Sequence, residues 1–67
     1  MTDDEAIEKL QKAGYTVGHA ESFYGHIRVW VYRGNLEAEV EVRQELRDLA
    51  EGRLTLEEIL AKRQKEA

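Results

Sequence analysis

The sequence predicts a small α+β domain: a helix, a three-stranded antiparallel meander, a short helix and a C-terminal helix (αβββαα). Two of the supporting observations are capping boxes, in which a threonine and a glutamate three residues later mark a helix start. One is Thr2 with Glu5 and the other is Thr55 with Glu58. The third is residues 26–42, which alternate between apolar and polar side chains. Because helices that follow a meander normally cover one sheet face, we expect them mainly on the valine-rich face.

Composition narrows the class of protein further. The chain of 67 residues forms one domain (1–67), has no cysteine and only two histidines, and carries a net charge of −4. These features argue against disulfides, a structural metal site and nonspecific nucleic-acid binding. No apolar run reaches the ~20 residues of a membrane span. The acidic N-terminus lacks the apolar stretch of a signal peptide. We therefore expect a cytoplasmic, non-membrane protein without metal or cofactor.

The first helix is predicted from Asp3 to Ala13. Acidic residues occupy its first turn, where they favour the helix dipole, and a glycine follows its last residue. Its apolar residues lie on one stripe: Ala6, Ile7, Leu10 and Ala13. A strand is predicted over 15–20, in which Gly18 indicates a bulge or a close backbone approach. Residues 21–25, "ESFYG", are predicted to be a loop.

The register of the following hairpin can be predicted by pairing. Gly34 and Asn35 suit the two central positions of a type II′ turn. Counting outward pairs Arg33 with Leu36, Tyr32 with Glu37, Val31 with Ala38, Trp30 with Glu39, Val29 with Val40, Arg28 with Glu41, and Ile27 with Val42. Apolar residues then share one face, and a slip of one residue would destroy the match. The alternative, a single helix over 35–52, leaves that match unexplained, so we favour the hairpin.

Two helices are predicted after the hairpin. Leu46, Leu49 and Ala50 have helical spacing, and Gly52 ends that short helix. The last helix begins at the second capping box and buries a stripe formed by Leu56, Ile59 and Leu60.

No catalytic motif is visible among the remaining polar residues. His19 and His26 flank the predicted loop, where they could form a proton-transfer or metal pair with Glu21 as a third ligand. The same pattern also fits exposed residues at strand ends, and we favour this interpretation for both histidines. A row of three carboxylates belongs to one strand: Glu37, Glu39 and Glu41. The row indicates either a solvated strand face or an acidic surface for a basic partner.

The aromatic residues of the hairpin are the strongest functional signal. Trp30 and Tyr32 are predicted on the face opposite the valines. Either the chain covers them itself, in a second small core, or they belong to an interface, because aromatics and arginine dominate binding hot spots. The predicted interface comprises Trp30, Tyr32, Arg28, Arg33, Glu39 and Glu41. A chain of this size has a marginal core and would gain from covering these residues in a homodimer.

Several segments resemble the HicA-type mRNA interferase toxins. These segments are "IEKLQKAGY", the Gly25-His26 pair near where that family carries Gly-Ser-His, and "VEV" followed by "DLAEGRLTLEEIL". The resemblance implies a double-stranded-RNA-binding-like fold and RNA cleavage, with His26 as the catalytic acid or base acting on a 2′-hydroxyl. The chain lacks the serine before the histidine and is acidic, whereas an RNA-cleaving protein is expected to be basic.

The leading prediction is therefore a small, non-enzymatic interaction or regulatory protein, with a protein partner or a second copy as its ligand. A HicA-like ribonuclease is the alternative. The agreement of every local signal with the fold is also typical of designed proteins, whereas the histidines and aromatics of residues 17–30 are not.

Overall fold

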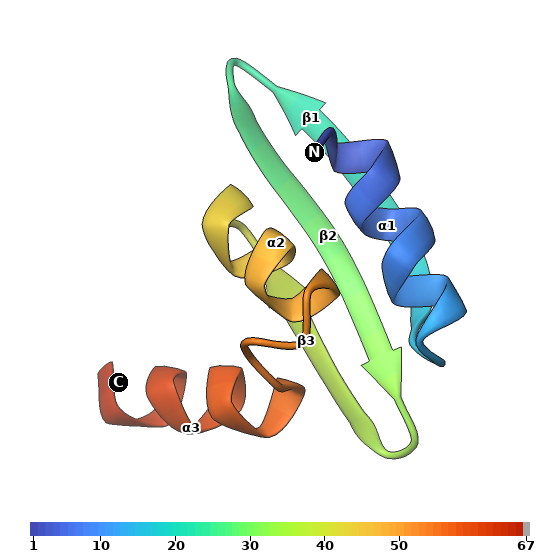
Figure 1. The fold of residues 1–67 in the computed structure, drawn as a ribbon. Helices are drawn as coiled ribbons and strands as arrows, with labels where there is room; N and C mark the ends of the chain where they lie inside the picture. Colours follow the sequence, from blue (N-terminus) through green and yellow to red (C-terminus); the bar gives the residue numbers. More distant parts are fainter. Residues whose placement is uncertain (67) are drawn as a thin grey trace.

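The computed structural model describes residues 1–66 and contains the predicted elements in the predicted order (Figure 1). Their bounds are α1 Asp3–Lys12, β1 Thr16–Phe23, β2 His26–Arg33, β3 Leu36–Val40, α2 Arg43–Ala50 and α3 Leu56–Glu66. The strands form one antiparallel sheet in the order β1-β2-β3. The α+β class and the αβββαα order are thus confirmed. None of the helices in residues 1–66 is long and apolar enough to cross a membrane.

The register of β2 against β3 is the predicted one over five pairs. They are Val29 with Val40, Trp30 with Glu39, Val31 with Ala38, Tyr32 with Glu37, and Arg33 with Leu36. Gly34 has a φ of 61°, as the first central position of a type II′ turn requires. A helix over 35–52 is excluded, because most of its first part is strand.

Two predicted pairs at the open end of this hairpin do not form. Strand β3 ends at Val40, so neither Ile27 with Val42 nor Arg28 with Glu41 is part of the ladder. Val42 instead precedes α2, and its carbonyl accepts a hydrogen bond from the amide of Leu46 at 3.1 Å. The chain leaves the sheet because it must turn into this helix, and the Val42 side chain remains exposed.

Strand β1 is longer than predicted, and the predicted loop "ESFYG" is mostly absent. Residues 21–23 belong to the strand, and only Tyr24 and Gly25 remain in the turn to β2. These two residues have φ values of 48° and 78°. Positive φ at both central positions is the mark of a type I′ turn, which matches the natural twist of a hairpin.

Gly18 has both features that the sequence indicated. The β1–β2 register shifts between Val17 and Ala20, which places a bulge at Gly18 and His19. A Cβ atom at Gly18 would lie 2.7 Å from Cε2 of Tyr32. The aromatic ring therefore occupies the space above the glycine, and any larger side chain would displace it.

The helices cover one face of the sheet. Figure 1 shows α1 and α2 side by side over that face, with α3 beyond strand β3. Helix α3 protects the outer edge of β3, because Arg63 donates a hydrogen bond to the carbonyl of Glu39. One buried core joins the sheet and helices: Ala6, Leu10, Tyr15, Ile27, Val29, Val31, Ala38, Val40, Leu46, Leu49, Leu56 and Ile59.

Candidate functional site

The sheet face opposite α1 and α2, called the outer face below, carries the candidate residues. Side chains alternate between faces along each strand, and paired residues share a face. The two registers therefore assign to the outer face Thr16, Glu21, Phe23, His26, Arg28, Trp30, Tyr32, Glu37 and Glu39. In Figure 1 no helix of residues 1–66 crosses this face.

Trp30 and Tyr32 are partly buried rather than fully exposed. Tyr32 packs its ring against Gly18, while Trp30 lies between Glu39 on β3 and the bulge of β1. Neighbouring strands thus cover part of each ring.

Charged side chains cross the outer face from β1 to β3. His19 Nε2 lies 3.1 Å from Glu21 Oε2, and Glu21 Oε1 lies 3.7 Å from Arg28 Nη1. Arg28 Nε lies 2.8 Å from Glu39 Oε1. The sequence predicted that Arg28 would pair with Glu41, and this prediction is wrong, because Arg28 pairs with Glu39 instead. A guanidinium is held beside Trp30 by a carboxylate on each neighbouring strand.

Glu39 lies beside a second carboxylate, Glu41, as well as beside Arg28. A hydrogen bond between the carboxyl groups of Glu39 and Glu41 raises the pKa of Glu39 above its usual 4.5, desolvation adds to the rise, and Arg28 opposes it. Arg63 opposes the rise as well, so the Glu39 carboxylate lies among both positive and negative groups.

Arg33 does not join the other predicted interface residues. It follows Tyr32 in β2, so strand alternation places it on the face that the helices cover. There its guanidinium carbon lies 4.8 Å from the ring centroid of Tyr15, a cation–π arrangement. We therefore leave Arg33 out of the outer-face set.

The histidines form no joint site. His19 pairs with Glu21, whereas the ring of His26 lies 6.4 Å from that of Phe23 at the turn. In residues 1–66 no group of three His, Cys, Asp or Glu residues is arranged to hold a metal ion.

Sequence reasoning missed the β1–β2 turn as an exposed aromatic feature. Phe23 and Tyr24 have 45% and 98% of their surface exposed, at the tip of a hairpin that extends past α1 (Figure 1). Arg43 supports the turn, because its Nη1 donates to the carbonyl of Gly25 at 2.6 Å while its Nε binds Asp3. The signal in the sequence was Tyr24-Gly25 between two alternating runs, but a tyrosine is an unusual first residue for a type I′ turn.

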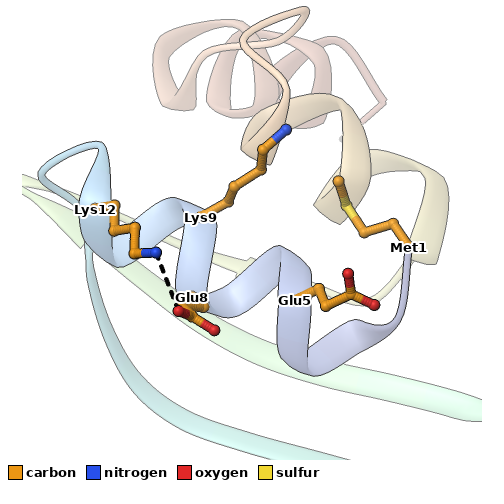
Figure 2. Close-up of a pocket in the computed structure, with 5 residues that line it drawn as sticks. All are labelled: Met1, Glu5, Glu8, Lys9 and Lys12. Atoms are coloured by element: carbon orange, nitrogen blue, oxygen red, sulfur yellow. Dashed lines mark ion pairs between the residues drawn. The ribbon is translucent and has the colours of Figure 1, made fainter.

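A surface depression of about 310 Å³ lies on α1 and offers no functional chemistry. Figure 2 shows that Met1, Glu5, Glu8, Lys9 and Lys12 line it, with Lys12 Nζ 3.1 Å from Glu8 Oε1. Glu5 is engaged in the capping box, and hydrogen bonds from Thr2 lower its pKa. Long, solvated side chains form this depression, and its charged groups are engaged in the capping box or in ion pairs.

Comparison of the chain with protein-family models, with curated protein sequences and with solved structures finds no match.

Proposed function

We propose that this chain is a small interaction protein of a regulatory kind, which binds a protein partner through the outer face. One observation carries the proposal: α1 and α2 lie on the valine-rich face and α3 lies beyond β3, while Trp30 and Tyr32 lie on the opposite face. An aromatic centre flanked by a fixed guanidinium has the composition of a binding hot spot.

A second copy of the chain is the simplest partner. The core of a 67-residue domain is marginal, so covering the remaining apolar area of Trp30 and Tyr32 in a dimer would add to stability. The outer face also carries both signs of charge, in Arg28 and the β3 glutamates, so one copy offers each sign to the other. Phe23, at the end of the same face, extends the apolar part of this surface toward the turn.

The test is Trp30→Ala, followed by sedimentation and by binding measurements. Because truncation of a hot-spot residue costs about 2 kcal/mol or more, we expect assembly to weaken at least about thirtyfold while the fold persists. Arg33→Ala is the matched control, since Arg33 also belongs to β2 but lies on the helix-covered face. A chain that stays monomeric at high concentration, with its Trp30 fluorescence protected from quenchers, would contradict self-association.

RNA cleavage by a HicA-like mechanism is the second candidate. The observation in its favour is the order of a helix, three antiparallel strands and a helix, together with an exposed His26 beside a turn that Arg43 supports. In this hypothesis His26 acts as general acid or base on an RNA 2′-hydroxyl. Incubation of RNA with pure protein tests it: cleavage that is lost in His26→Ala would replace the interaction hypothesis.

A further inference from the structure

The two edges of the sheet differ in their protection. At the β3 edge, Arg63 of α3 occupies the carbonyl of Glu39. At the β1 edge, the Phe23–His26 pair closes the two-residue turn. Because hydrogen-bonded and non-hydrogen-bonded pairs alternate in an antiparallel ladder, the N–H and C=O groups of Ser22 and Ala20 point away from β2. Within residues 1–66 no hydrogen bond of the structure engages these groups.

A groove lies beside this open segment, on the inner face of the hairpin. Its volume is about 160 Å³, and Ile7, Ala20, Ile27 and Val29 form its apolar part. Residues of α1, β1 and β2 line it. Figure 1 shows that the hairpin of these two strands extends past the N-terminal end of α1. Carboxylates border the groove, among them Asp4 and Glu21. The groove is thus apolar at its floor and acidic at its margin.

We propose that the β1 edge and this groove bind an extended segment of a partner protein, which adds to the sheet as a fourth strand next to β1. Main-chain hydrogen bonds to Ala20 and Ser22 supply the attachment, as in other complexes formed by strand addition. The bulge at Gly18 limits regular pairing to the part of β1 between Ala20 and the turn, so the docked segment is short.

The alternation of strands specifies the chemistry of the segment. Its residues opposite Ala20 and Ser22 share their face and place their side chains at the groove, which suits valine, isoleucine or leucine. The residues between them lie on the other face, near Glu21, which suits lysine or arginine. The partner segment is therefore an alternation of aliphatic and basic residues.

Charge makes a second copy of this chain a poor occupant of the same edge. Pairing β1 with β1 of another copy would bring Glu21 and the acidic N-terminus of α1 close to their equivalents, in a chain of net charge −4. A basic segment meets the opposite sign at each of these places. Glu21 is the one residue of this surface that also belongs to the outer face, and Trp30 is not part of it, so the proposal stands or fails independently of Trp30.

The probe is a synthetic nine-residue peptide of alternating valine and lysine, compared with one of alternating valine and glutamate. Isothermal titration and amide NMR with the full chain measure binding. We expect the lysine peptide to bind at least about tenfold more tightly, because like charges oppose the glutamate peptide. The amides of Ala20 and Ser22 should shift and become protected from exchange. Equal binding of the two peptides, or shifts confined to other elements, would overturn the proposal.

Ser22→Pro tests the β1 edge without disturbing the fold. Its N–H points away from β2, so proline removes the docking donor and leaves the β1–β2 ladder intact. Ala20→Arg is a second variant, which places a long, charged side chain at an exposed position where the groove should take an aliphatic side chain of the segment. Both should weaken the lysine peptide at least about tenfold, while Trp30→Ala should leave it unchanged. Undiminished binding by both variants would refute the site, and a dimer that only Ser22→Pro dissolves would make a second copy the occupant instead.

Discussion

The two hairpins of this sheet share strand β2 but differ in almost every other respect. The β2–β3 hairpin pairs without a shift, has a glycine at the turn position that needs positive φ, and is buttressed by α2 and α3. The β1–β2 hairpin contains a bulge, has a tyrosine in a left-handed turn position, and leaves one strand edge open. The β2–β3 hairpin satisfies the requirements of folding, whereas the β1–β2 hairpin retains features that folding alone does not explain. The β1–β2 hairpin is therefore where binding of an extended partner segment is to be sought.

The largest expected difference between the hairpins is in the free energy of unfolding that is lost when a side chain is truncated. Val31→Ala removes a fully buried side chain that both neighbouring strands contact. It should lower the free energy of unfolding by about 2 kcal/mol, from lost burial and the cavity left behind. Ser22→Ala, at the exposed end of β1, should change it by less than about 0.5 kcal/mol. Urea denaturation of both variants measures the contrast, and similar losses would mean that the two hairpins are equally part of the core.

Gly18→Ala tests the contact between the bulge and the outer face. The new methyl group would lie 2.7 Å from the Tyr32 ring, so the ring must move. We expect a loss of about 1 to 2 kcal/mol, typical of an overpacked site. Tyr32→Ala in the same chain should remove most of that loss, because the displaced ring is then absent. A penalty that persists in the double mutant would locate the cause in the backbone of the bulge.

Tyr24→Asn tests the strained turn, and its expected effect is smaller than those of Val31→Ala and Gly18→Ala. A bulky residue at a φ of 48° is disfavoured, whereas Asn-Gly is the preferred type I′ pair. Thermal unfolding should show a gain of about 0.5 to 1 kcal/mol. Since 98% of the Tyr24 surface is exposed, no packing is lost to offset the gain. A less stable variant would show that the tyrosine is held by the fold rather than retained for contact with a partner.

The same contrast explains what the sequence could predict. The β2–β3 register followed from Gly34, Asn35 and the strict alternation around them, because every local preference agreed. The end of β1 was missed because Tyr24 occupies a position where asparagine or aspartate is usual. Local propensity reads such a segment as a loop, and only the pairing of Phe23 with His26 makes it a hairpin.

The candidate surface was predicted less completely than the fold, for geometric reasons. Alternation placed Trp30, Tyr32 and Arg28 on one face, and the structure has them there. The same alternation excludes Arg33, whose stacking on Tyr15 depends on a contact with the segment before β1. The partial cover of Trp30 depends on the bulge, whose position became clear only with the β1 register.

Residue-by-residue amide hydrogen exchange tests most directly whether the outer edge of β1 is unpaired while the β2–β3 ladder belongs to the buried core. The β2–β3 ladder is buried and continuous, so the amides of Val29 and Val31 should exchange only on global unfolding. The amides of Ala20 and Ser22 point away from β2 and should exchange at rates close to those of an unfolded chain. Protection of Ala20 and Ser22 equal to that of Val31, in the free monomer, would contradict the account, because it would mean that the chain already covers this edge itself.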